Sequence, residues 1–457
     1  MKFFWLRCLG LAFALFVGVC CTPGHSSAAS ARTALTQAAD SGAQATPGTA
    51  SAAPVSAEKK VTAYTLPPDL YRKAHNLGKI AFWGRLVTFF YSLIVLLLIL
   101  KWKLAPKFRD WAERIVSVRF VQALIFVPLF FFAFDVLSLP IGIARHWILR
   151  LYGISVQGWG SWLWDWTKGE LIGFVIGSIV IWILYAVIRK SPQRCWFYFW
   201  AISLPLAVFL FFLTPLVIDP LFHKFEPLQQ KDPGLTASLE KMVRRAGEDI
   251  PPERMFWMGA SEKLNAVDAY VTGIGASKRM VVWDTTIAKM NTPQIVFVTG
   301  HEMGHYVLNH VWKGLAFFAM LLFIFYYLVF RLIGWVLERW GGSWGIRGVA
   351  DWASLPAILL ILIILFFVSS PIGNAFSRHL EHQADQYGLE VTHGLTPDSS
   401  QIAAQSFQIL GEVDLADPDP GPVDIFLFYD HPAIPDRVRY SLTYNPWANS
   451  GHGEFVK

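Results

Sequence analysis

The sequence predicts a mainly α-helical, polytopic membrane protein that carries one small α/β segment outside the lipid. Three observations support this fold class. Hydrophobic residues make up 54% of the 457 residues and charged residues only 16%, whereas a soluble domain carries about 25% charged residues. The apolar residues are gathered in six long runs, and one polar stretch separates the fourth run from the fifth. The same figures exclude a disordered chain, a collagen-like chain and a simple soluble globule.

Residues 1–25 have the pattern of a signal peptide or of an N-terminal membrane helix. Lys2 and Arg7 precede an apolar stretch, and small residues follow at 26–29. This order of basic, apolar and small residues favours a cleaved signal peptide. Residues 26–64 are rich in Ala, Ser, Thr, Pro and Gly. Such a composition does not bury a core, and we expect a flexible linker there.

Six apolar runs are long enough to cross about 30 Å of hydrocarbon at about 1.5 Å per residue. Four lie within residues 65–217 and two within residues 314–376. The predicted spans are 81–101, 119–142, 171–188, 196–217, 314–337 and 354–376. The stretch 143–170 carries five tryptophans, which indicates a loop at the membrane interface. We therefore predict a multi-pass protein of a bacterial inner membrane, with the lipid bilayer as a partner.

Basic residues give conflicting indications of orientation. The loop 102–118 and its flanks hold six Lys and Arg, and the turn 189–195 adds three. Under the positive-inside rule both would be cytoplasmic, which places residues 218–311 on the outer face. However, five further basic residues precede the first span on the opposite side. The sidedness of the polar segment stays open.

The net charge and the cysteines exclude two other classes of function. The formal net charge is +6, but the basic residues form no cluster of the kind that binds nucleic acid, and we expect no nucleic-acid partner. Three of the four cysteines lie within the first 21 residues. Neither a disulfide framework nor a cysteine-based zinc site is therefore expected.

Residues 218–313 form the polar segment between the fourth and fifth spans. Residues 235–245 have a helical pattern. The runs 269–272 and 280–283 are of β type and flank a Gly-Ile-Gly turn, which predicts a hairpin. Thr292 as N-cap and Pro293 at the first helical position then predict the start of a helix.

That helix contains an H-E-x-x-H motif. His301 and His305 are four residues apart, so both imidazoles lie on one helical face and are placed to bind one zinc ion. Glu302 projects beside them and is placed to accept a proton from a water molecule activated by the metal. The pattern predicts a metallopeptidase site with one zinc ion per chain.

A catalytic zinc site needs a third protein ligand. Glu381 and Asp385, just beyond the sixth span, are also four residues apart on an expected helix. Glu381 is our candidate for the third ligand, and Asp385 for a partner that orients a liganding imidazole. The competing ligand candidates are three histidines, His310, His379 and His382.

Together these motifs resemble the CAAX prenyl protease type I family of integral-membrane zinc peptidases. The H-E-x-x-H motif is joined to Glu381-x-x-x-Asp385 across a hydrophobic hairpin, as in that family. The runs 268–273 and 281–285 resemble the family's edge strand and the strand that follows it. Asp430-His431-Pro432, with Arg437 beyond, resembles its C-terminal element. The resemblance covers about residues 65–445.

The resemblance implies a role for each matching residue. It implies His301, His305 and Glu381 as zinc ligands and Glu302 as general base. In the C-terminal segment, 377–457, it implies that His431 and Arg437 stabilise the oxyanion. The substrate peptide would bind along the edge strand, either at Asp268, Ala269 and Tyr270 or, in a second register, at Asn265. The resemblance further implies a helical transmembrane barrel around a chamber, with an α/β zincin-like catalytic segment.

The expected function is therefore zinc-dependent hydrolysis of peptide bonds at the membrane. The substrate is a peptide or protein, either a lipidated CAAX-type peptide or another membrane-associated peptide. The rivals are an HtpX-like quality-control peptidase and, in a different class, an inactive membrane scaffold or transporter. The family usually has seven spans and a cytosolic catalytic face. Six are clear in this chain, and residues 1–21, if retained, would restore the seventh.

Overall fold

The computed structural model describes residues 60–273, 277–448 and 451–456. The predicted signal peptide or first membrane helix (1–25) and most of the predicted linker lie outside these residues. Within the described part the chain is mainly helical, and it contains a four-stranded sheet.

Six helical segments in the described part are long and apolar enough to cross a membrane, in agreement with the prediction. Each predicted span falls inside one of them, and each helical segment extends beyond its predicted span at one or both ends. They comprise α2 (Pro68–Lys101), α4 (Arg119–Leu151), α5 (Trp159–Lys190), α6 (Cys195–Leu213) with short turns to Leu221, α11 (His310–Val336) continued to Trp344, and α13 (Leu355–Thr392) with a turn from Trp352.

The tryptophan-rich stretch 143–170 is not the loop that we predicted. Helix α4 continues to Leu151 and α5 begins at Trp159, which leaves only a short connection. Trp147 and Trp164 lie on these helix ends and are 58% and 61% exposed. The many tryptophans of this stretch mark the membrane interface, where amphipathic rings are favoured. This preference does not depend on whether the backbone is helical.

The sheet has the order β1-β2-β4-β3. Its strands are β1 (Lys224–Pro227), β2 (Met255–Gly259), β3 (Ala269–Thr272) and β4 (Arg279–Trp283). Strands β3 and β4 are antiparallel, with Tyr270 opposite Val281, which confirms the predicted hairpin. Strand β3 lies at an edge of the sheet, so within the described part of the chain one side of its backbone has no neighbouring strand.

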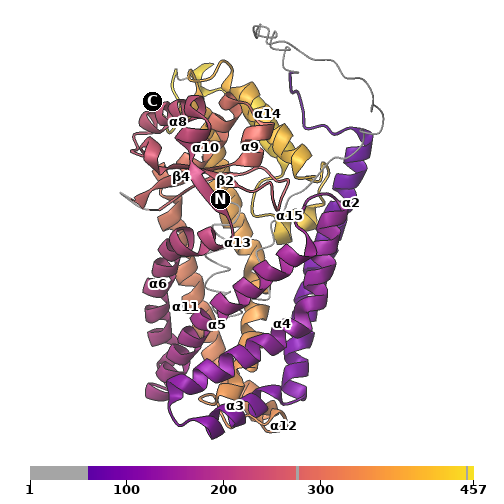
Figure 1. The fold of residues 1–457 in the computed structure, drawn as a ribbon, viewed down its shortest axis with the longest axis vertical. Helices are drawn as coiled ribbons and strands as arrows, with labels where there is room; N and C mark the ends of the chain where they lie inside the picture. The colour runs from indigo at the N-terminus through magenta and orange to yellow at the C-terminus, as the bar shows by residue number, and fades with distance from the viewer. Residues whose placement is uncertain (1–59, 274–276, 449–450, 457) are drawn as a thin grey trace, which may run out of the picture.

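Shorter helices complete the two ends of the molecule. They are α3 (Leu104–Ile115), α7 (Leu228–Lys231), α8 (Pro233–Arg245), α9 (Asp284–Lys289), α10 (Thr292–Val307), α12 (Gly342–Trp344), α14 (Ser399–Val413), α15 (Pro422–Phe428) and α16 (Ile434–Thr443). Figure 1 shows the sheet gathered with α8, α10 and α14 at one end of the long helices, and α3 and α12 at the other. Helix α13 is 38 residues long, about 57 Å, so it reaches from the membrane part into the sheet-containing end.

The start of α10 differs by one residue from the prediction. Asn291, not Thr292, is the N-cap. Its side chain accepts a hydrogen bond from the Gln294 N–H, and the Gln294 side chain accepts one from the Asn291 N–H. This reciprocal capping box satisfies two N–H groups at once, which a threonine at the next position could not do with the same glutamine.

The last residues of the predicted linker are held against α14. The N–H of Val61 donates to Gln401 Oε1, and Gln401 Nε2 donates back to the Val61 carbonyl, both at 3.0 Å. Gln408 makes the same reciprocal pair with Thr65. Because these amide side chains satisfy the backbone of an extended segment, residues 60–65 pack along the helix even though their composition is typical of a linker.

Candidate metal centre

Three buried side chains converge where α10 meets α13. His301 and His305 come from α10, and Glu381 comes from α13. His301 Nε2 lies 3.3 Å from His305 Nε2 and 3.2 Å from Glu381 Oε2. His305 Nε2 lies 3.6 Å from Glu381 Oε1. One ligand atom from each of the three residues lies within 4.8 Å of the other two, so the structure brings the three predicted ligands together.

The chemistry of this cluster fits zinc. Two imidazole nitrogens and one carboxylate oxygen are the donor set of a catalytic zinc site that keeps one position open. Glu381 Oε2 is buried without a hydrogen-bond partner among the described residues, although His301 Nε2 and His431 Nε2 lie 3.2 Å and 3.3 Å away. A buried carboxylate oxygen left in this way is costly unless a cation satisfies it.

The two histidines differ in charge. Burial lowers the pKa of His305 well below its ordinary value, so its ring is neutral and has a lone pair for a metal. Burial also disfavours the imidazolium of His301, but the carboxylates of Asp385 and Glu381 outweigh this effect and raise its pKa to about 9. Without metal, a proton therefore partly neutralises the two carboxylates, and a bound cation would replace that proton.

Asp385 and Arg437 form a second layer behind His301. Asp385 Oδ1 lies 2.8 Å from His301 Nδ1, on the side of the ring away from the other ligands. Arg437, on α16, donates two hydrogen bonds to the Asp385 carboxylate, from Nε at 2.8 Å and from Nη2 at 2.5 Å. All three side chains are buried. Asp385 therefore lies where it could orient the His301 ring, and this role stays a prediction.

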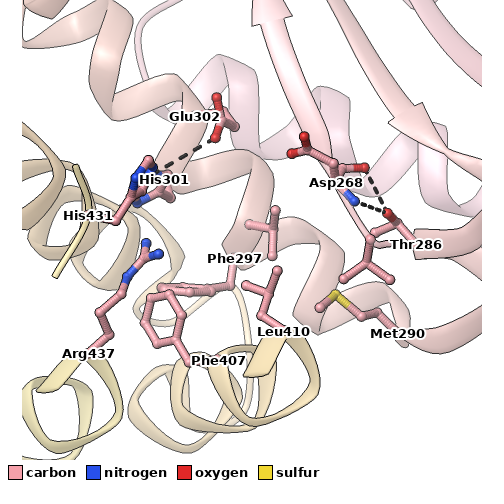
Figure 2. Close-up of a pocket in the computed structure, with 12 residues that line it drawn as sticks. Asp268, Thr286, Met290, Phe297, His301, Glu302, Phe407, Leu410, His431 and Arg437 are labelled. Carbon is pink, nitrogen blue, oxygen red and sulfur yellow. Dashed lines mark hydrogen bonds and ion pairs between the residues drawn. The ribbon is translucent and has the colours of Figure 1, made fainter. Parts of the chain in front are cut away.

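Glu302 lies beside the ligands in a small pocket. Its Oε1 is 3.9 Å from His301 Nε2, and its side chain is buried. Burial raises the pKa of Glu302 above the ordinary value for a glutamate. Figure 2 shows Glu302 and His301 on one side of this pocket and Asp268 and Thr286 across from them. A carboxylate in this position is poised to accept a proton from a nucleophile bound in the pocket.

His431 reaches the same cluster from the loop before α16. Its Nε2 lies 3.3 Å from Glu381 Oε2, and its Nδ1 lies 2.9 Å from Asp430 Oδ1. The other histidines that we considered as ligands are placed differently. His379 and His382 are exposed on α13. His310 is buried against the outer side of His305.

The sequence reasoning missed the apolar wall of the pocket. Six side chains form it: Val267, Met290, Phe297, Val298, Phe407 and Leu410. Phe407 and Leu410 come from α14, more than a hundred residues along the chain from the H-E-x-x-H motif. No local pattern distinguishes them from ordinary core residues of an amphipathic helix.

The predicted substrate-binding residues lie in different places. Asp268 lines the pocket, and its N–H and carbonyl both bond to Thr286 Oγ1, at 2.8 Å and 2.7 Å. The side chain of Ala269 packs into the core beneath β3. Tyr270 points to the other face of the sheet, where its hydroxyl is 4.0 Å from Met258 Sδ. Asn265 donates from Nδ2 to the Gly153 carbonyl at 2.7 Å, which ties the segment to the connection after α4.

Close packing of glycines holds the ligands of α10 and α13 together. A Cβ on Gly388 would lie 3.1 Å from the backbone nitrogen of His301 and 3.2 Å from its Cα. A Cβ on Gly300 would lie 2.9 Å from Val391 Cγ1, and one on Gly304 would lie 3.0 Å from Tyr387 Cβ. The two helices therefore approach each other along small residues, and this approach places Glu381 against both histidines.

We expect Gly388→Ala to damage the metal centre from a distance. The new methyl group would press on backbone atoms of α10, which move only if the helix moves. Overpacking of this kind costs about 1–3 kcal/mol, and separating the ligands should raise the zinc dissociation constant about 10–100-fold. Thermal unfolding and a chelator competition titration measure the two effects. The matched control is Gly373→Ala in the same helix, where the added Cβ has open space, and wild-type zinc affinity in both variants would contradict this account.

Comparisons with known proteins agree with this geometry. Peptidase family M48 matches residues 229–443, and the CAAX prenyl protease N-terminal family, described as five membrane helices, matches residues 53–224. The uncharacterized metalloprotease YhfN of Bacillus subtilis is 35% identical over 338 residues, 74% of this chain and 77% of its own length. CAAX prenyl protease 1 of Saccharomyces cerevisiae is 24% identical over 415 residues, 83% of this chain and 89% of its own.

A solved structure shares the fold. The crystal structure of S. mikatae Ste24p superposes with a TM-score of 0.71 at 23% identity, covering 83% of this chain and 90% of that one. At this identity the likeness shows the fold, and it confirms the predicted class of helical transmembrane barrel with a small α/β segment. The two family matches and the 35% identical relative go further. The chain belongs to peptidase family M48 and is a multi-pass membrane metalloprotease of the CAAX prenyl protease type I family.

Proposed function

We propose that this metalloprotease is a zinc-dependent endopeptidase of a bacterial inner membrane that cleaves lipidated or other membrane-associated peptides. The observation that carries the proposal is the position of Glu302. Its buried carboxylate shares one pocket with His301 and lies beside the cluster of two histidines and a glutamate. This combination of a proton acceptor and a metal-binding set is what metal-assisted hydrolysis of a peptide bond requires.

The residues of this site fall into two groups in the proposed reaction, the zinc ligands and the general base. His301, His305 and Glu381 would hold the zinc ion. When bound, zinc would supply Lewis acidity, which makes water nucleophilic near neutral pH and polarises the scissile carbonyl. Glu302 accepts the proton of the attacking water at its carboxylate and later delivers it to the leaving amine. Its raised pKa favours the first transfer, because a carboxylate that binds a proton more tightly is the stronger base.

His431 is the proposed donor to the oxyanion. Its Nε2 faces Glu381 Oε2 at 3.3 Å, so a carbonyl bound beside the metal would lie within its reach. Asp430 Oδ1 accepts from Nδ1 and orients the ring so that Nε2 points into the site, where it would donate in the imidazolium form. The structure orients Arg437 differently, with Nε and Nη2 both directed to Asp385. Its contribution to the oxyanion remains a prediction.

Arg437→Gln tests which task this arginine performs. If Arg437 acts through Asp385, its loss frees the carboxylate that orients His301, and the zinc dissociation constant should rise by about 10-fold or more. We expect this result. Arg439→Gln is the matched control, because Arg439 lies on the same helix and pairs at the surface with Asp436. A chelator competition titration reads the affinity. Unchanged zinc affinity with a reduced kcat would instead assign Arg437 to the oxyanion.

The proposed substrate seat is the edge of the sheet next to the pocket. Strand β3 is an edge strand among the described residues, and an extended peptide binds such an edge by main-chain hydrogen bonds. Asp268 precedes this strand and lines the pocket, whereas Asn265 is bonded to Gly153. These contacts support the register at 268–270 over the register at Asn265.

Two findings support lipidated or membrane-associated peptides as substrates. The relatives named CAAX prenyl protease 1 match over most of this chain, and the site lies at the end of six apolar helices. The match of residues 53–224 to the N-terminal family of CAAX prenyl proteases also favours this group over the HtpX-like rival. A signal-like N-terminus argues for a substrate range wider than prenylated proteins.

A paired cleavage assay tests the proposed function. The full chain is purified in detergent and given one quenched peptide with a farnesylated cysteine and the same peptide with an unmodified cysteine. We expect zinc-dependent cleavage of the farnesylated peptide, with cleavage abolished by chelation and restored by zinc. Equal cleavage of both peptides would show that the protein is an endopeptidase without a preference for lipidated substrates. Failure to cleave either peptide, in zinc-loaded and folded protein, would contradict the proposal.

A further inference from the structure

His305 has a buried neighbour that the metal site does not use as a ligand. Its Nε2 faces His301 and Glu381, while its Nδ1 lies 3.1 Å from His310 Nδ1. The two rings are nearly perpendicular, at 78°, with centroids 5.0 Å apart. On its far side, His310 Nε2 lies 3.1 Å from Gln383 Oε1. Both histidines are fully buried.

These contacts define one arrangement of protons when Nε2 of His305 is a metal ligand. The liganding nitrogen uses its lone pair, so the proton of the neutral ring sits on Nδ1 and must be donated. The partner within reach is His310 Nδ1, which therefore accepts and carries no proton. The proton of His310 then sits on Nε2 and is donated to Gln383 Oε1, an atom that only accepts.

The turn between α10 and α11 places His310 close to His305. Helix α10 ends at Val307, and α11 begins at His310. Between them Asn309 has a φ of +57°, in the left-handed region that asparagine tolerates best among residues with a side chain. This sharp turn brings His310 back beside His305. Gln383 lies on α13 between Glu381 and Asp385, so the helix that supplies the third ligand also anchors the chain of hydrogen bonds.

We propose that His310 and Gln383 are positioning residues that set the tautomer and orientation of His305. The inference deepens the proposed zinc site and rests on it. The two liganding histidines thus have different supports: His301 faces the charged pair Asp385 and Arg437, and His305 faces the neutral pair His310 and Gln383. His310 is not a fourth ligand, because its Nδ1 faces the outer nitrogen of His305 and its Nε2 faces Gln383.

The test compares two substitutions of His310 in the full chain. His310→Leu fills the space but removes the acceptor, whereas His310→Asn places an amide oxygen near the former Nδ1. We expect His310→Leu to raise the zinc dissociation constant about 10–100-fold, and His310→Asn to recover most of that loss. Zinc affinity is read by chelator competition, and the cobalt(II) absorption spectrum reports the geometry of the site. His382→Leu, an exposed histidine on α13, is the control and should match wild type.

Several outcomes would overturn the inference. Wild-type zinc affinity in His310→Leu would remove any positioning role, and equal losses in the leucine and asparagine variants would make the role one of packing only. A lower zinc coordination number in His310→Leu by X-ray absorption would make His310 a ligand. If His310→Leu does not fold, Gln383→Leu and Gln383→Glu carry the test, with weaker zinc binding expected only for the leucine. Because affinity is measured without substrate, failure here is distinct from failure of the proposed function, in which zinc-loaded wild-type protein cleaves neither peptide.

Discussion

Glu302→Gln is expected to retain the metal and to lose peptide hydrolysis. Glutamine has nearly the shape of glutamate, and none of the proposed ligands is changed, so zinc should bind with near wild-type stoichiometry. The amide cannot accept the proton of the attacking water, and loss of a general base costs about 10²–10⁴-fold in rate. Glu302 is buried beside His301, whereas Asp268, the other carboxylate among the described residues that line the pocket, lies across from it. Asp268 is therefore not placed to take over the role of Glu302.

The measurement is kcat on the quenched peptide together with metal analysis of the same sample. Glu262→Gln serves as the control, because Glu262 is exposed in the same segment of the chain. The control should match wild type in both readings. Full activity in Glu302→Gln would remove this residue from the mechanism, and loss of zinc in that variant would show that Glu302 takes part in binding the metal.

Glu381→Gln is expected to lose both the metal and the activity. The carboxylate is the only anionic member of the three-residue cluster, and it lies against His301, His305 and His431. Replacing it with a neutral amide removes the charge that balances a divalent cation. Loss of a group that only orients a metal ligand weakens metal binding about 10–100-fold. Loss of the Glu381 carboxylate should raise the zinc dissociation constant by more than this.

The contrast between the two variants separates the ligands from the base. Both variants should be inactive, but Glu302→Gln should still contain zinc, whereas Glu381→Gln should not. His379→Gln, an exposed position one half-turn earlier on α13, controls for changes at that end of the helix. Zinc binding at wild-type affinity in Glu381→Gln would exclude Glu381 as the third ligand.

The metal cluster could be predicted because its residues follow local helical periodicity. His301 and His305, and likewise Glu381 and Asp385, are four residues apart, so each pair shares a face whatever the rest of the chain does. The hairpin of β3 and β4 was predictable for the same reason, since its two runs flank a glycine-containing turn. The six spans follow from length and hydropathy alone.

The remaining features depend on tertiary contacts that no local pattern encodes. Phe407 and Leu410 form part of the pocket only because α14 packs on α10. Asn265 pairs with Gly153, more than a hundred residues earlier in the chain. The position of His310 was visible in the sequence, but its contact with His305 depends on the left-handed turn at Asn309. Such contacts decide whether a polar residue binds a metal, orients a ligand or joins two segments.

X-ray absorption at the zinc edge of the purified full chain tests the central claim most directly. The account predicts one zinc ion per chain with two nitrogen ligands and one or two oxygen ligands at about 2.0–2.2 Å. It also predicts that sulfur is absent from the first coordination shell, because the proposed ligands are His301, His305 and Glu381. A protein that binds no zinc, or a spectrum with sulfur ligands or six oxygen ligands, would contradict it.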